Sequence, residues 1–338
     1  MKPLSLLFLV LAGITIVLAA SLMTISSDDL NDESSTTPEL QKISFRQGFI
    51  TGPDWIPYVV AQEKGFYEEE GFDVTLGTGK GTPSTIKLVD AKKDDFGVVF
   101  ASGAVIAKSV GSKVKSVAAF QQENSFRVYY NIDSGINFPN ELKGKKIASS
   151  QGTANNIEFP VFAKAVGLDD KKVDWVHSQS YLQLLEIFKK GEVDALMGRD
   201  FVHGFQLDNA NYKGYRVFDP ARYGVKMYGQ QLIVHEDTIR ENPEMVGKFT
   251  RASLKGWEYA MENPEEAVKI YVERFPQFEA EKELKKWKIL FKPVINHEYS
   301  VGHQNPEIWE TMNEDFFELG IIENKIDIDD IYTDQFLP

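Results

Sequence analysis

The chain contains no cysteine among its 338 residues, and this absence excludes several kinds of chemistry. A disulfide, a thiolate nucleophile and a cysteine-ligated metal all need a thiol. A lipid-modified N-terminal cysteine, which anchors many exported bacterial proteins, is excluded for the same reason. Hydrophobic residues make up 43% of the chain and aromatic residues 12%, so a packed core must supply the stability, and the length suits about two domains.

Basic residues are scarce relative to acidic ones, with 37 Lys and Arg against 50 Asp and Glu and a net charge of −13. Because phosphate binding needs a basic surface, we do not expect nucleic acid as a partner. An anionic membrane surface is disfavoured for the globular part on the same ground. An acidic surface that keeps a soluble protein dispersed is the simplest interpretation.

Catalytic motifs are also missing from the sequence. The five histidines show no HExxH or other metal-ligand spacing, and there is no GxSxG elbow. Acidic runs such as 68–70 and 327–330 are most simply solvated faces. We therefore expect no enzyme activity, no cofactor and no bound metal.

Residues 3–25 form a long apolar run without a charged side chain, and Lys2 precedes it. The run is long enough to cross a bilayer, which needs roughly 20 apolar residues. Ala19, Ala20 and Ser21 could instead form a signal-peptidase site. We expect 1–25 to be a signal peptide or an N-terminal membrane anchor, and 26–41, which is acidic and rich in Ser and Thr, to be a flexible linker. Both alternatives place the rest of the chain outside the cytoplasm.

Strand and helix patterns alternate along most of the remaining chain, as in an α/β protein with doubly wound sheets. Strands are expected from 43, over 72–76, 96–100, 114–120 and 126–131, and helices over 58–64, from 82 to 89 and over 102–110. The same alternation continues, with strands expected at 145–149, 173–176 and 193–197 and helices at 157–166 and 181–190. Asn-Pro pairs then begin helices at 243, 264 and 306, with another helix over 279–290.

This order predicts two lobes joined by two crossing strands. The first lobe is expected to comprise 42–130 and 233–338, and the second 131–232. In open α/β sheets, ligands bind beyond the carboxyl ends of the strands. Two facing lobes would make a cleft there, and hinge closure would bury a solute.

The loops at those strand ends supply candidate ligand contacts. Trp55 and Tyr58 follow the first strand, and the alternative for both is packing in the core. A Gly-rich loop with Lys80, Gly81 and Thr82 leads into a helix whose amides suit an anion or a carbonyl oxygen, or it is a flexible turn. The remaining candidates are polar residues at other strand ends or aromatic residues beside the crossings: Ser102, Tyr129, Gln151, Thr153, Asn155 and Tyr228. Ser102 could be engaged as a helix cap, and the two tyrosines could be hinge packing.

The order of these segments resembles the extracytoplasmic solute-binding proteins of ABC importers with a type II periplasmic-binding-protein fold. The resemblance rests on ISFRQGFITGPDWIPYVVAQEKGFYEEEGFDVTLGTGKGTPSTIKLVDAKKDDFGVV at 43–98, LKGKKIASSQGT at 142–153, GEVDALMG at 191–198, KGWEYAMENPEEAVKIY at 255–271 and the tail at 305–338. The nearest branch binds thiamine-pyrimidine precursors, sulfonates, nitrate and taurine. It implies a monomer, in the periplasm or at the cell surface, that delivers a small molecule to a membrane permease.

The resemblance also implies roles for particular residues. Trp55 occupies the loop whose aromatic residue stacks on the pyrimidine in the precursor binders. His203 stands where those proteins carry a glutamate, with Asp200 three residues earlier, so the pyrimidine ligand is open to doubt. Arg199 could instead hold an anionic head group through two hydrogen bonds, or form a surface pair with Asp200. We rank a thiamine-type pyrimidine first, then a sulfonate, taurine or nitrate-like anion, and then a flavin.

Two other functional classes share this fold. A pyrimidine synthase of the same fold carries a cysteine-rich run, and a lysine and histidine after its third strand. Residues 98–104 contain neither lysine nor histidine, which disfavours that enzyme. A membrane-tethered sensory domain would use the same cleft, but only Met1 and Lys2 precede the apolar run.

Overall fold

The computed structural model describes residues 39–49, 52–151, 153–291 and 300–338. The predicted leader and nearly all of the predicted linker lie outside these ranges. No helix within them is long and apolar enough to cross a bilayer. Residues 39–338 form one compact unit, and it contains two five-stranded sheets.

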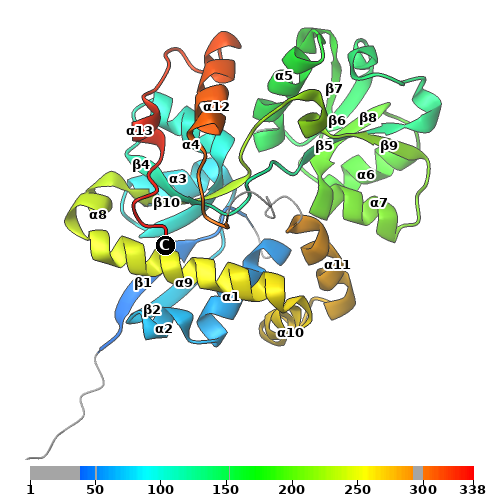
Figure 1. Ribbon diagram of the computed structural model, residues 1–338. Helices are drawn as coiled ribbons and strands as arrows, with labels where there is room; N and C mark the ends of the chain where they lie inside the picture. The colour runs from blue at the N-terminus through cyan, green and yellow to red at the C-terminus, as the bar shows by residue number, and fades with distance from the viewer. Residues whose placement is uncertain (1–38, 50–51, 152, 292–299) are drawn as a thin grey trace, which may run out of the picture. The chain divides into compact units, whose positions relative to one another are not determined.

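The first sheet has the strand order β2-β1-β3-β10-β4 (Figure 1). Its strands are β1 (Gln41–Arg46), β2 (Phe72–Gly77), β3 (Phe96–Phe100), β4 (Val114–Ala119) and β10 (Gln230–His235). β1 pairs in parallel with β2 and β3, whereas β10 runs antiparallel to β3 and β4. The sheet is therefore mixed, and its middle contains a strand from late in the chain.

The second sheet has the order β7-β6-β8-β5-β9. Its strands are β5 (Phe126–Asn131), β6 (Lys146–Ser149), β7 (Asp174–His177), β8 (Ala195–Arg199) and β9 (Tyr215–Phe218). β5 is antiparallel to β8 and β9. We predicted 126–130 to belong to the first lobe, but this strand pairs wholly within the second sheet. The chain therefore passes between the sheets at 120–125 and returns at 219–229.

Helices follow most of the strands. They are α1 (Ile56–Glu63), α2 (Phe66–Glu69), α3 (Thr82–Asp90), α4 (Ala101–Ser109), α5 (Ala154–Ala165), α6 (Tyr181–Lys189), α7 (Phe205–Asn209), α8 (Glu236–Glu241), α9 (Pro243–Glu262), α10 (Pro264–Arg274), α11 (Ala280–Leu290), α12 (Pro306–Glu318) and α13 (Ile328–Ile331). Short turns of helix at Pro53–Trp55 and Asp200–Gly204 follow β1 and β8. Pro243, Pro264 and Pro306 begin their helices as predicted, because the missing N–H of proline loses no hydrogen bond there.

Aromatic rings build the core around the first sheet. Phe249 of α9, the long yellow helix of Figure 1, stacks on Phe96 with 3.9 Å between ring centroids and lies edge-on to Phe45. α9 also packs against α1, where Gly256 meets the backbone of Pro57. A Cβ on Gly256 would lie 2.3 Å from the Pro57 oxygen, so this close approach needs glycine. The tight packing fixes the start of α1 and the loop that precedes it.

Candidate functional site

Four polar residues, Gln47, Asp54, Gln121 and Gln230, form a hydrogen-bonded row across the strand ends of the first sheet. Gln47 follows β1, Gln121 follows β4, and Gln230 begins β10 between them. Nε2 of Gln47 donates to the carbonyl oxygen of Asp54 at 3.2 Å, and Nε2 of Gln230 donates to Oδ2 of Asp54 at 3.0 Å. Oε1 of Gln121 accepts from the backbone N–H of Gln230 at 3.3 Å. The row lies at the carboxyl ends of β1 and β4, where ligands bind in such sheets.

Several atoms in this row have no hydrogen-bond partner among the described residues, although they are buried. These atoms are Oε1 of Gln47, Oε1 of Gln230 and Nε2 of Gln121, and Nε1 of Trp55 and Oγ of Ser125 share this property. Buried polar atoms are almost always paired, so a group of unpaired ones needs a partner of its own. The set offers two acceptors, two N–H donors and one hydroxyl, and it carries no net charge.

Asp54 is the acidic member of the row. Burial raises the pKa of its carboxyl to about 6, the hydrogen bond from Gln230 opposes that rise, and the buried Glu283 adds to it. Glu283 lies on α11, which contacts both the Pro53–Trp55 turn and the Asp200–Gly204 turn. Oε1 of Glu283 accepts from Nζ of Lys286 at 2.6 Å, and its Oε2 has no partner within the described ranges. α11 therefore brings a second buried carboxyl close to Asp54.

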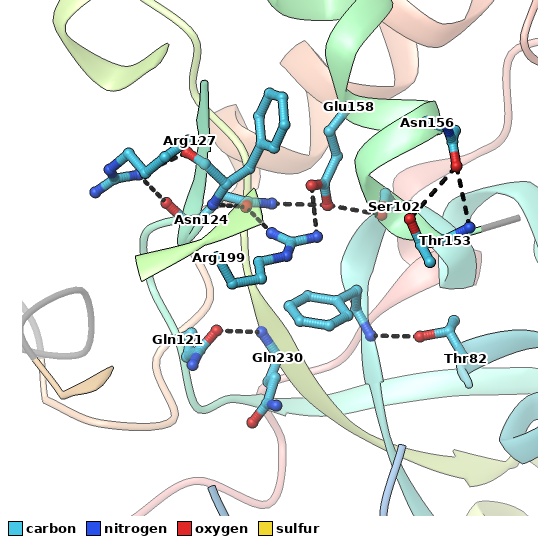
Figure 2. A network of polar contacts seen from close by, with 12 residues as sticks. Thr82, Ser102, Gln121, Asn124, Arg127, Thr153, Asn156, Glu158, Arg199 and Gln230 are labelled. Carbon is cyan, nitrogen blue, oxygen red and sulfur yellow. Dashed lines mark hydrogen bonds and ion pairs between the residues drawn. The ribbon is translucent and has the colours of Figure 1, made fainter. Parts of the chain in front are cut away.

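A buried ion pair lies at the carboxyl end of a strand of the second sheet. Nη2 of Arg199, the last residue of β8, is 2.6 Å from Oε2 of Glu158 on α5 (Figure 2). Oε1 of Glu158 accepts from Oγ of Ser102 at 3.1 Å and from Nδ2 of Asn124 at 2.9 Å. Burial raises the pKa of Glu158 and lowers that of Arg199, and their mutual attraction opposes both shifts.

This ion pair joins elements of both sheets. The guanidinium carbon of Arg199 lies 4.1 Å from the ring centroid of Phe100, the last residue of β3, and Ser102 lies on α4. Arg199 also donates to Oδ1 of Asn124, which lies in the first passage between the sheets. We expected Arg199 to be free for an anion or paired with Asp200 at the surface. Its carboxylate partner is instead Glu158, and the pair is buried.

Asp200 has a different arginine as its partner. Nη2 of Arg127 is 3.1 Å from its Oδ2, and Nη1 of the same arginine is 3.3 Å from Oδ1 of Asp219. The hydroxyl of Tyr129 donates to Oδ1 of Asp200 at 3.0 Å. Burial raises the pKa of Asp200, while Arg127 opposes the rise. Tyr129 and Asp200, two predicted contacts, are thus engaged with each other.

His203 lies under the end of β8. Its Nδ1 accepts from the backbone N–H of Arg199 at 3.1 Å. Burial and the nearby guanidinium lower the pKa of His203 to about 4, so its ring is neutral near pH 7. A Cβ on Gly198 would lie 2.4 Å from the His203 ring, which explains why a glycine precedes Arg199.

The two predicted aromatic contacts occupy different surroundings. Tyr58 lies edge-on to Phe45, Phe120 and Trp257, deep in the core of the first sheet. Trp55 packs edge-on against Phe275 with 6.0 Å between centroids, and it is also buried. Nε1 of Trp55 and the hydroxyl of Tyr58 are both buried without a hydrogen-bond partner among the described residues. Trp55 directly follows Asp54 in the chain, and this position associates Trp55 with the polar row.

The Gly-rich loop is closed by backbone hydrogen bonds. The N–H groups of Gly79 and Gly81 donate to the carbonyl oxygens of Phe49 and Gly48, at 3.2 and 2.8 Å. These two amides are therefore occupied rather than open to an anion. Lys80 is exposed. Oγ1 of Thr82 accepts from the N–H of Phe100 at 3.2 Å and so ties this loop to β3 (Figure 2).

The predicted loop of the second sheet caps a helix. The N–H of Thr153 donates to Oδ1 of Asn156 at 3.2 Å, and its hydroxyl donates to the Ser150 carbonyl at 3.0 Å. Gln151 is exposed and Asn155 is buried on the first turn of α5. Of the predicted residues in this loop, only Thr153 has a hydrogen-bonding role among the described contacts.

Tyr228 lies on the second passage between the sheets. It lines a cavity of about 300 Å³ together with residues of 122–126, 220–228 and 303–308. Its ring tilts against Trp309 of α12 with 5.1 Å between centroids, and its hydroxyl hydrogen-bonds Asn305. The tyrosine therefore ties the passage at 219–229 to the C-terminal segment.

Sequence reasoning missed Gln47, Asp54, Gln121, Glu158 and Gln230. A weak signal was present for Glu158, because it is a single acidic residue in the apolar helical stretch 157–163. The glutamines directly follow or begin apolar strand patterns, but nothing local distinguishes them from solvated strand ends.

The sequence matches a described family and several characterised proteins. The family described as NMT1/THI5 like matches residues 52–267. A formylaminopyrimidine-binding protein of Halalkalibacterium halodurans is 26% identical over 322 residues, covering 92% of each chain. The 4-amino-5-hydroxymethyl-2-methylpyrimidine phosphate synthase THI13 of Saccharomyces cerevisiae is 26% identical over 271 residues, covering 77% of this chain and 79% of the yeast protein. Relatives of this chain therefore include both binding proteins and enzymes.

Solved structures show the same fold. The periplasmic aliphatic sulphonate binding protein SsuA of Escherichia coli superposes with a TM-score of 0.69 at 14% identity, covering 87% of this chain and 92% of that chain. The alkanesulfonate-binding protein SsuA of Xanthomonas axonopodis pv. citri, bound to MOPS, gives 0.67 at 14% identity and covers 87% and 99%. The predicted fold class, a two-lobed α/β fold of the type II periplasmic-binding-protein kind, is confirmed. With its matching residues 52–267, the chain belongs to the NMT1/THI5-like family.

Proposed function

We propose that this protein captures a small neutral heteroaromatic molecule, foremost a thiamine-precursor pyrimidine, between its two lobes and delivers it to an ABC permease. The observation that carries this proposal is the row of buried, neutral carboxamides with unpaired atoms beside Asp54. The formylaminopyrimidine-binding relative, which matches over 92% of both chains, supports the ligand class. The periplasmic binding proteins of the same fold support an extracytoplasmic location.

The unpaired atoms match the edge of an aminopyrimidine. Such a ring presents an amino donor beside ring-nitrogen acceptors. Oε1 of Gln47 and Oε1 of Gln230 would accept from the amino group, and Nε2 of Gln121 would donate to a ring nitrogen. Asp54 would strengthen the contact, because hydrogen bonds to a carboxylate are stronger than neutral ones.

The charges at the cleft disfavour an anionic ligand. Arg199 is paired with Glu158, and Arg127 with Asp200 and Asp219. An anion entering beside these carboxylates would meet repulsion rather than an unpaired guanidinium. A sulfonate, taurine or nitrate ligand therefore fits this arrangement less well than a neutral ring.

Closure would occur about the segments 120–125 and 219–229. The solute docks on the glutamine row of the first lobe, and the second lobe then rotates about these segments to cover it. The ligand would favour the closed form to the extent that it binds that form more tightly. We expect the protein to act as a monomer.

The synthase relatives make an enzyme the second candidate. The residues directly after β3 are Ala101 and Ser102, so the lysine and histidine that mark the synthase are absent from that position. We therefore propose that the protein binds its ligand without converting it.

Calorimetry on the full-length protein tests the proposal. The probes are 4-amino-5-hydroxymethyl-2-methylpyrimidine, formylaminopyrimidine, riboflavin, ethanesulfonate, taurine and nitrate. Binding of a pyrimidine, recovered unchanged after prolonged incubation, is the expected result. Recovery of a converted product would replace the proposal with an enzyme, and binding of anions alone would replace the ligand class.

Two neighbouring glutamines provide a matched pair of variants. Gln230→Leu removes a member of the row, and we expect its affinity for the pyrimidine to fall at least ~10-fold because bonded polar groups would be left unpaired. Gln231→Leu is the control, because alternation along β10 points this side chain to the other face, where it accepts from Ser116 at 3.0 Å. Equal losses in both variants would argue against the row as the binding site.

A further inference from the structure

The surroundings of Glu158 have the composition of an anion-binding site. Its carboxylate accepts three hydrogen bonds, from a guanidinium, a hydroxyl and a carboxamide, at 2.6, 3.1 and 2.9 Å. All three partners donate, as the binding of a carboxylate or sulfonate requires. Glu158 and Ser102 are fully buried and Arg199 is 7% exposed, so the site is protected from water.

Two of the three donors have contacts other than Glu158 that hold them in place. Arg199 stacks on the Phe100 ring and donates to Oδ1 of Asn124. Asn124 is fixed in turn, because its Oδ1 accepts from the N–H of Phe126 at 2.8 Å and its Nδ2 donates to the Tyr228 carbonyl at 3.2 Å. Figure 2 shows Arg199, Asn124 and Ser102 converging on the Glu158 carboxylate. Donors arranged beforehand in this way would remain in position if the carboxylate were removed.

We propose that Arg199, Ser102 and Asn124 form an anion site that the chain fills with its own carboxylate, Glu158, and that this occupancy excludes free anions from the cleft. Glu158 is then the residue that determines selectivity for neutral ligands. The site would accept a small carboxylate or sulfonate once Glu158 is shortened. The selectivity part of this inference rests on the proposed function, whereas the existence of the anion site does not.

The geometry explains why a free anion does not displace Glu158 in the native protein. The Glu158 carboxylate is attached covalently to α5 and is held within hydrogen-bonding distance of its donors. Its effective concentration at the site therefore exceeds the concentration of a free anion in solution. Removing the carboxylate leaves a buried guanidinium without its counter-ion, which is strongly destabilising. An exogenous anion of the right size would restore the pairing and stabilise the fold by mass action.

Chemical rescue of Glu158→Ala tests the site. Thermal unfolding of the full-length variant is followed while sodium acetate or methanesulfonate replaces sodium chloride at constant ionic strength. We expect a lower midpoint than in the native protein, with at least half of the loss recovered at saturating acetate and a saturable heat of binding in calorimetry. The native protein should show neither effect.

Two controls isolate the site from general salt effects. Glu63→Ala removes the carboxylate of an exposed pair with Arg274, whose Nη1 lies 2.9 Å from Oε1 of Glu63, and should show no rescue because water already solvates that arginine. Glu158→Ala combined with Arg199→Met should also show none, since the cation is gone. Equal responses to acetate in Glu158→Ala and Glu63→Ala would overturn the inference.

A second shortened variant keeps the inference testable if Glu158→Ala does not fold. Glu158→Ser keeps a polar side chain on α5 but vacates the space beside Arg199, so methanesulfonate should bind it at least tenfold more tightly than the native protein. No gain in Glu158→Ser would refute the anion site. Failure of the native protein to bind any pyrimidine would refute the proposed function and leave the rescue result unaffected.

Discussion

Gln230 donates a hydrogen bond of 3.0 Å to the Asp54 carboxylate, although 176 residues separate them. The bond connects the strand that returns from the second sheet with the first loop of the first sheet. The ligand site that we propose is therefore assembled by residues that lie far apart along the described chain.

The Asp54→Asn variant should separate stability from binding. Burial raises the pKa of this carboxyl to about 6, so between pH 4 and 6 the folded protein binds a proton that the unfolded chain has released. The free energy of unfolding of the native protein therefore falls by roughly 2–3 kcal/mol as pH rises through this window. Above the window this contribution no longer changes with pH. The asparagine amide of the variant does not titrate, and its oxygen could still accept from Gln230.

We expect Asp54→Asn to be more stable than the native protein at pH 7 and equally stable near pH 3.5, measured by urea unfolding. Its affinity for a pyrimidine should nonetheless fall at least ~10-fold, because a charge-assisted hydrogen bond is replaced by a neutral one. A variant that gained no stability at pH 7 would show that Asp54 is not held at a raised pKa.

His203→Asn should have the opposite dependence on pH. The pKa of His203 is lowered to about 4, so between pH 6.5 and 4 the unfolded chain binds a proton that the folded protein excludes. This contribution to stability is present above pH 6.5 and is lost as pH falls to 4, by roughly 2–3 kcal/mol. The amide oxygen of asparagine can still accept from the Arg199 N–H.

The free energy of unfolding of the native protein should therefore fall relative to that of His203→Asn from pH 7 to pH 4. His177→Asn is the control, since His177 is the last residue of β7 and its side chain is exposed. A constant difference for His203→Asn across this range would mean that the pKa of His203 is not lowered in the folded protein.

Trp55→Phe and Tyr58→Phe should distinguish the two predicted aromatic contacts. Trp55→Phe keeps an aromatic ring against Phe275 but removes the unpaired Nε1, so pyrimidine affinity should fall by ~1 kcal/mol, the usual worth of a hydrogen bond. Tyr58→Phe preserves packing among Phe45, Phe120 and Trp257, and affinity should not change. Calorimetry of both variants measures this contrast, and a larger loss in Tyr58→Phe would reverse the assignment.

The sequence was sufficient to predict most elements because each has a local cause. The Asn-Pro pairs mark the starts of α9, α10 and α12, and the apolar run at 96–100 predicts β3. The helix expected from Ile157 begins at Ala154, because Thr153 and Asn156 cap it through a hydrogen bond that propensity alone does not reveal. Sequence pattern also placed Arg199 correctly at a strand end.

The partners of the site residues could not be predicted in this way. Asp200 is the neighbour of Arg199 in sequence, yet the ion pair forms with Glu158, which the fold brings from α5 to the end of β8. Asp200 is left to Arg127, the second residue of β5. Such choices depend on the strand order of the second sheet, and nothing local in the sequence encodes that order.

β10 lies between β3 and β4, so those two strands never pair with each other. When residues 39–125 have emerged from the ribosome, β1 to β4 are present. β10, the strand that joins β4 to the rest of the first sheet, has not yet been made. Roughly a hundred further residues must emerge before the gap closes, and contacts this distant in sequence slow folding. Until then β3 and β4 each expose an unpaired edge on the side of the missing strand, and such edges favour pairing with other chains.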